Sequence, residues 1–229
     1  MAELKEKKVV ELNDTTNVEK ETKISRSSRI NLQISGAAYF GALSIVLSAI
    51  LAPIIPRVPG WGIAYFDPVS IVWVMCFFIF GTKAGLLCCG IGTLGLMPFD
   101  PFAPIGPLMK LFATLSLIII PIILLRLYKT EEGIRNSQKL KNSSNFIITS
   151  ILGIFLRIVV MMFFNVLLFL TLFPLEYANL GFLGMSDVTG WTAVIIVVIL
   201  INAETSLWDL LIPYAVTFGA RLDQKFEIW

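Results

Sequence analysis

Long apolar stretches, separated by short polar or proline-rich segments, make up most of the chain after its first thirty or so residues. The stretches cover residues 33–55, 68–80, 84–97, 107–127, 145–173 and 189–219. A helix needs roughly 20 apolar residues to cross the ~30 Å hydrocarbon layer of a membrane. The pattern therefore predicts an all-α, polytopic integral membrane protein with six transmembrane helices.

Two places in this pattern need a more specific interpretation. Residues 68–80 and 84–97 are short and are separated by Gly81, Thr82 and Lys83, which predicts two short helices joined by a hinge. Residues 189–219 would measure about 45 Å as one straight helix, which is more than a membrane requires. Because polar residues interrupt this stretch at 202–206, we expect 191–201 to be re-entrant or near the surface and the last span to begin at Asn202.

Composition supports a membrane environment and narrows the chemistry. Only 15% of the 229 residues are charged and 56% are hydrophobic, whereas soluble domains carry about a quarter charged residues. The net charge of +2 gives no reason to expect a nucleic-acid partner. Histidine is absent and the three cysteines form no ligand pattern, so we expect no metal and no cofactor.

The distribution of basic residues predicts the orientation. Of the 18 lysines and arginines, seven lie in the N-terminal segment, one is Lys83, five lie between Arg126 and Lys141, and two follow Gly219. Cytoplasmic loops carry the excess of such residues, so both termini are predicted to be cytoplasmic in a multi-pass protein of the cell membrane. We expect residues 1–31 to form a disordered tail, 32–222 the membrane domain, and 223–229 a short C-terminal tail.

The loops predicted to lie outside, 56–67, 98–106 and 174–187, are rich in proline, glycine and aromatic residues and nearly free of cations. Such segments can fold over a cavity as a lid. They can equally form the aromatic belt found at membrane interfaces. Both interpretations stay open from sequence.

Polar residues inside apolar spans are costly and usually face a cavity or a partner. Arg157 and Asn165 share one face of the fifth stretch, because eight residues make about two helical turns. Aromatic side chains can stack on a heterocycle while amides and charges fix its polar edges. The predicted substrate site consists of Trp61, Tyr65, Lys110, Arg157, Asn165, Asn202, Glu204 and Trp208. The alternative is an Arg157–Glu204 or Arg157–Asp209 ion pair that only fixes how the helices align.

The first apolar stretch carries small residues at helical spacing, including Ala38, Gly41 and Ala42. In lipid, such faces let helix backbones approach closely. They either pack inside the same bundle or form a docking face for another membrane subunit. No ATP-binding loop, metalloprotease motif or serine-nucleophile motif occurs, so we do not expect an enzyme.

Several segments together resemble the substrate-binding S-components of energy-coupling-factor (ECF) vitamin transporters, of the riboflavin-transporter-like kind. They are AAYFGA at 37–42, FDPVSIVWV at 66–74, FGTKAGL at 80–86, GPLMKLFAT at 106–114, and NAE and GARL between 202 and 222. The resemblance covers roughly residues 33–225. It implies a binding pocket under the first outer loop and between the later helices.

The resemblance also implies a role and partners. A vitamin-like molecule, with riboflavin as the first candidate, would be captured from outside, and thiamine-, pyrimidine- or queuosine-type solutes stay open. The A-x-x-x-A face formed by Ala38 and Ala42 would dock onto a transmembrane coupling subunit that carries two ATPases. Two alternatives come from other classes: a proton-coupled secondary transporter using Glu204 or Asp209, and a membrane scaffold subunit that transports nothing.

Overall fold

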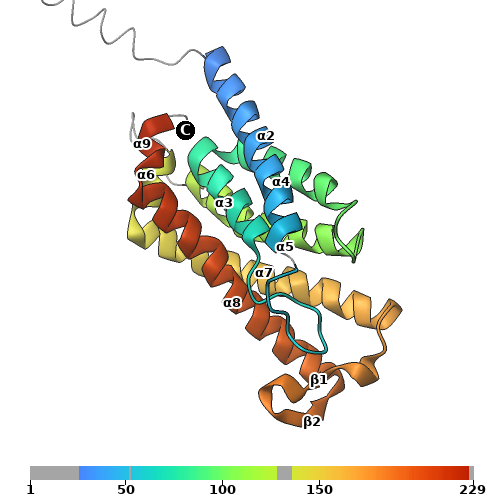
Figure 1. The fold of residues 1–229 in the computed structure, drawn as a ribbon. Helices are drawn as coiled ribbons and strands as arrows, with labels where there is room; N and C mark the ends of the chain where they lie inside the picture. Colours follow the sequence, from blue (N-terminus) through green and yellow to red (C-terminus); the bar gives the residue numbers. More distant parts are fainter. Residues whose placement is uncertain (1–25, 52, 128–135, 227–229) are drawn as a thin grey trace, which may run out of the picture. The chain divides into compact units, whose positions relative to one another are not determined.

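The computed structural model describes residues 26–51, 53–127 and 136–226, and this part of the chain is mostly helical (Figure 1). The helices are α2 (Arg26–Leu51), α3 (Pro68–Phe80), α4 (Thr82–Leu96), α5 (Ile105–Leu127), α6 (Asn136–Lys141), α7 (Ser143–Thr171), α8 (Gly190–Gly219) and α9 (Leu222–Phe226). The chain divides into two units, Met1–Leu32 and Gln33–Trp229, and the packed helices belong to the second. Most of the predicted N-terminal tail, 1–31, lies outside the described residues.

Four of the described helices, α2, α5, α7 and α8, are long and apolar enough to cross a membrane. Helices α3 and α4 are also apolar but have only 13 and 15 residues, or about 20 and 23 Å at 1.5 Å per residue. The coarser part of the prediction is therefore confirmed: the protein is mostly helical and has several helices able to span a membrane.

The hinge between the two short helices lies where the sequence predicts it. Asp67 caps the start of α3 by accepting a hydrogen bond from the Val69 amide at 3.1 Å, and Pro68 occupies the first turn, where proline is tolerated. Gly81, with φ +92°, ends α3, and α4 begins at the next residue. Gly85 lets the two helices approach, because a Cβ there would lie 2.7 Å from the Phe77 Cβ.

The predicted break in the last span is wrong: α8 is one continuous helix of 30 residues. Asn202, Thr205, Ser206 and Asp209 follow helical spacing and are all buried on one face. The first three donate their side-chain hydrogen bonds to the carbonyl four residues earlier. These three side chains therefore have partners inside the helix, and Arg157 of α7 donates to Asn202, Thr205 and Asp209, so the polar residues do not interrupt the helix.

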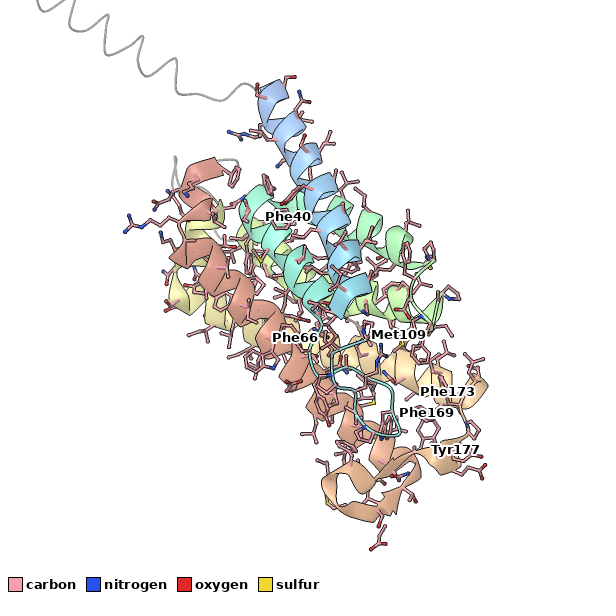
Figure 2. All side chains as sticks on the ribbon, viewed as in Figure 1. Phe40, Phe66, Met109, Phe169, Phe173 and Tyr177 are labelled. Atoms are coloured by element: carbon pink, nitrogen blue, oxygen red, sulfur yellow. The ribbon has the colours of Figure 1, made fainter. Side chains whose placement is uncertain are left out.

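Two hydrophobic cores lie in the second unit. One gathers side chains of α3, α4 and α8 around Trp73, whose Nε1 donates to the Ser44 Oγ of α2 at 2.9 Å. Phe40 of α2 meets Phe80 of α3 edge-on in the same region, with 5.8 Å between the ring centres (Figure 2). The other core joins the start of α8 to the loop 53–67 through Val58 and neighbouring residues.

Between α7 and α8 the chain forms two 3-10 turns, η1 (Leu175–Tyr177) and η2 (Gly181–Leu183), and two short strands. Strands β1 (Asn179–Leu180) and β2 (Met185–Thr189) pair antiparallel. This small hairpin departs from a strictly all-α fold, in a segment that the sequence identified only as a loop.

Candidate functional site

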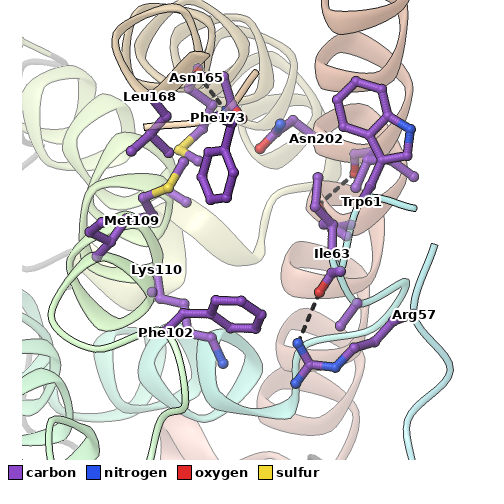
Figure 3. Close-up of a pocket in the computed structure, with 18 of the residues that line it drawn as sticks. Arg57, Trp61, Ile63, Phe102, Met109, Lys110, Asn165, Leu168, Phe173 and Asn202 are labelled. Carbon is purple, nitrogen blue, oxygen red and sulfur yellow. Dashed lines mark hydrogen bonds between the residues drawn. The ribbon is translucent and has the colours of Figure 1, made fainter. Parts of the chain in front are cut away.

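A cavity of about 360 Å³ lies among α5, α7, α8 and the loop 53–67 (Figure 3). Small-molecule sites range from roughly 300 to 1,000 Å³, so its size suits a ligand. Its lining consists of Arg57, Gly60, Trp61, Gly62, Ile63, Ala64, Asp67, Ser70, Asp100, Phe102, Ile105, Gly106, Met109, Lys110, Ala113, Arg157, Met161, Asn165, Leu168, Phe169, Phe173, Pro174, Tyr177, Ala178, Ile201, Asn202 and Thr205.

Aromatic and methionine side chains form much of the apolar wall. Phe102 and Phe173 project toward the centre of the cavity, with Met109 beside them (Figure 3). Phe169, Phe173 and Tyr177 gather at the end of α7 and the turn that follows it (Figure 2). Flat rings and flexible thioethers of this kind can contact both faces of a heterocycle.

The loop 53–67 is held in place by its own hydrogen bonds and by contacts with other segments. The Val58 amide donates to the Ile63 carbonyl at 2.7 Å, and the Trp61 Nε1 donates to the Asn179 carbonyl at 3.0 Å. Trp61 also meets Phe169 edge-on, with ring centres 5.7 Å apart. These contacts fasten the loop to both the hairpin segment and α7, so it closes one side of the cavity.

Arg57 connects this loop to the segment 97–104. Its Nη1 donates to the Gly62 carbonyl at 2.9 Å, and its guanidinium lies 5.8 Å from the Phe102 ring centre, within cation–π distance. Asp100 accepts a hydrogen bond from the Phe102 amide at 2.8 Å. The two segments thus meet at Phe102, which lines the cavity.

Lys110 of α5 and Asp67 at the start of α3 form an ion pair on the cavity wall, with 3.5 Å between Nζ and Oδ1. Their side chains are 30% and 15% exposed. Asp67 also accepts from the Ser70 hydroxyl, which in turn accepts from Thr114 of α5 at 3.0 Å. A chain of polar contacts therefore links α3 to α5 beside the cavity.

Arg157 of α7 is the most buried cation of the site. Its Nη1 lies 2.6 Å from Asp209 Oδ2, and the two side chains are 7% and 0% exposed. The guanidinium also donates to Asn202 Oδ1 at 3.2 Å and to Thr205 Oγ1 at 3.0 Å. Of the two ion pairs that the sequence allowed, the structure has the one with Asp209.

Asn165 lies two turns along α7 from Arg157 and also lines the cavity. Its amide nitrogen donates to the Met161 carbonyl at 2.8 Å. Nothing among the described residues donates a hydrogen bond to its Oδ1, which is therefore an available acceptor on the cavity wall.

Five of the eight predicted substrate residues line this one cavity: Trp61, Lys110, Arg157, Asn165 and Asn202. The other three lie elsewhere. Tyr65 packs against the core around Val58, and Glu204 accepts a hydrogen bond from the Trp208 indole on a different face of α8. Trp208 is 45% exposed.

The sequence did not single out several lining residues. They are Arg57, Asp67, Asp100, Phe102, Met109, Phe169 and Phe173. Thr205, which also lines the cavity, belongs to the polar stretch 202–206 and shares the helical face of Asn202 and Asp209. The aromatic residues of separate loops carry no spacing that relates them.

The three small residues proposed for docking separate into two groups. Ala38 and Ala42 are exposed on one face of α2. Gly41 is buried, and a Cβ at this position would lie 2.8 Å from the Ile91 Cγ2 of α4. The alanines are thus free to meet a partner, while the glycine is used for packing inside the bundle.

Within the described residues, no group of three or more His, Cys, Asp or Glu side chains could hold a metal ion. Cys76, Cys88 and Cys89 are free thiols buried in the core around Trp73. Comparisons with protein-family models, with curated proteins and with solved structures gave no match for the chain. What the site can do follows from its own chemistry: aromatic faces, buried donors and acceptors, and a closed side suit the binding of a small organic molecule.

Proposed function

We propose that this protein is the substrate-binding S-component of an ECF-type importer, which captures a vitamin or related small metabolite from outside the cell. The main support for the proposal is the cavity, because its volume suits a small ligand and its wall combines aromatic side chains with buried polar groups. A separate coupling subunit and two ATPases would deliver the ligand inward. Riboflavin is the first candidate ligand, since its flat ring system suits a wall of aromatic and methionine side chains.

The predicted orientation supports capture from outside. With both termini in the cytoplasm and six spans, the loop 53–67 and the segments 97–104 and 172–189 would all lie on the outer side. These three segments contribute lining residues such as Trp61, Phe102 and Tyr177. The ligand would therefore enter from the side where the loops close over the cavity.

The exposed face of α2 supports a partner in the membrane. Ala38 and Ala42 lie four residues apart and leave a shallow surface on which another helix backbone can approach closely. A binding subunit without an ATP site needs such a contact, because its transport step must be driven by another protein.

Reconstitution into liposomes tests the proposal against its two rivals. The chain would be combined with an ECF coupling subunit and its ATPases, and uptake of radiolabelled riboflavin would be followed with and without ATP. Uptake that requires both the module and ATP supports the proposal. Uptake by the chain alone that an uncoupler abolishes would identify a proton-coupled transporter, and a stable complex that binds no small molecule would identify a scaffold.

A further inference from the structure

The charged side chains around the cavity form three sets of one cation and one carboxylate, and the sets differ in how deeply they are buried. Arg157 and Asp209 are nearly fully buried, and Lys110 and Asp67 are partly exposed. Arg57 is exposed in the loop 53–67, and its guanidinium lies 5.8 Å from the ring centre of Phe102, whose amide donates to Asp100. Each set contains one cation and one carboxylate, so the formal charges that the described residues place around the cavity cancel.

From this balance we propose that the cavity selects an uncharged ligand and that the Lys110–Asp67 pair sets this selectivity; the inference rests on the proposed function. A ligand with a net charge would have to break one of the pairs or remain without a counter-charge in a poorly solvated site. A neutral ligand leaves every pair intact. The barrier to charged ligands is therefore built from the pairs themselves.

The donors and acceptors on the cavity wall that stay available to a ligand indicate which polar groups the ligand should carry. A guanidinium has five N–H donors, and the described residues use three of those of Arg157. The remaining two can bind a carbonyl or ring nitrogen. Asn165 Oδ1 can accept from an N–H or O–H group of the ligand. The structure thus fits an uncharged heterocycle that carries both a hydrogen-bond acceptor and a donor.

Lys110 and Asp67 are the residues through which this selectivity can be changed. Their 3.5 Å contact is longer than the 2.6 Å contact of Arg157 with Asp209, and both side chains line the cavity while remaining partly exposed. Removing the Asp67 charge leaves the Lys110 ammonium facing the cavity without its partner. Asparagine at this position still offers an oxygen to cap α3, so the fold is expected to survive.

The test compares ligands that share a ring but differ in charge. Riboflavin would be paired with flavin mononucleotide, and nicotinamide with nicotinate and 1-methylnicotinamide, in binding titrations and thermal-shift measurements on the purified protein. The wild type is expected to bind the uncharged member at least about tenfold more tightly than its charged relatives. The ratio measured is the affinity for the charged member over that for the uncharged member. Asp67→Asn is expected to raise this ratio for the anionic member by about tenfold, and Lys110→Gln to raise it for the cationic member.

Asp187→Asn is the matched control, because it removes the same charge from an exposed carboxylate of strand β2 that does not line the cavity. It should change the ratio by less than about threefold, since solvent screens that position. A wild type that prefers a charged member, an Asp67→Asn ratio no different from the control, or release of a charged native molecule on denaturation would overturn the inference while binding itself stands. If no probe binds and denaturation releases nothing, the proposed function fails and the inference fails with it.

Discussion

Arg157 on α7 and Asp209 on α8 lie 2.6 Å apart, Nη1 to Oδ2, and both side chains are almost completely buried. Asn202 and Thr205 accept two further hydrogen bonds from the same guanidinium. An unpaired charge inside a membrane span is costly, so this cluster fixes how the two helices align. Because Arg157, Asn202 and Thr205 also line the cavity, the same contacts hold the binding groups in place.

Breaking this pair should destabilise the protein strongly. Asp209→Asn leaves the guanidinium buried without a carboxylate, which is expected to lower the free energy of unfolding by about 3–5 kcal/mol. The double variant Arg157→Met with Asp209→Leu removes both charges and should recover most of that loss. The measurement is the fraction of monomer that remains, by size-exclusion chromatography, after the detergent-solubilised proteins are heated. A double variant no more stable than Asp209→Asn contradicts the pairing.

Close packing of α4 against α3 gives a second prediction. A Cβ at Gly92 would overlap the indole of Trp73, which is fully buried and hydrogen-bonded to Ser44. Gly92→Ala should therefore cost about 1–3 kcal/mol of stability. Gly90→Ala on the same helix meets nothing within 4 Å and should be neutral or stabilising by up to about 1 kcal/mol. Equal melting temperatures for the two variants would show that the helices do not pack this way.

A third prediction concerns ligand contact at Asn165. Asn165→Leu keeps the branching and the number of heavy atoms of the side chain but removes the available Oδ1 acceptor, so affinity should fall about tenfold or more while the melting temperature of the empty protein changes little. The control is Glu204→Gln, which alters a carboxylate outside the cavity lining. If the control weakens binding and Asn165→Leu does not, the ligand lies elsewhere.

The two faces of α2 can be separated experimentally. Ala42 is exposed, so Ala42→Trp should leave the isolated protein stable but abolish co-purification with the coupling subunit and the uptake that depends on it. Gly41→Leu should instead lower the melting temperature of the isolated protein, because the leucine side chain would clash with Ile91 of α4. Normal coupling of the Ala42→Trp variant would remove the docking role from this face.

The helices could be predicted well because each apolar stretch has a length and ends that are set locally. The bounds of α3, Pro68–Phe80, follow from Asp67, Pro68 and Gly81, each of which signals a helix end by itself. The continuity of α8 could not be predicted from apolarity alone. It depends on Arg157, more than forty residues earlier, to accommodate Asn202, Thr205 and Asp209 on one buried face.

The site was predictable only where a residue stood out in its own segment. Arg157, Asn165 and Asn202 are polar groups in apolar helices, and all three line the cavity. Glu204 stood out equally but lies on a different face of α8 with Trp208, four residues along. Helical spacing alone places Asn202, Thr205, Ser206 and Asp209 on one face and Glu204 on another, so the sequence could have separated them. Phe102 and Asp67 reach the cavity through tertiary contacts, which no local pattern encodes.

If the cavity holds a small organic molecule, the purified protein should release that molecule on denaturation, and mass spectrometry can identify it. Nanomolar binders, with about 12 kcal/mol of binding free energy, often retain their ligand through purification. Ala113→Phe, which places a ring in the cavity lining, serves as the comparison, provided that it elutes as a folded monomer. The expected result is release of a near-stoichiometric uncharged heterocycle from the wild type and little or none from the variant. A wild type that releases nothing and shows no thermal shift across a vitamin panel, or equal release from both proteins, would contradict it.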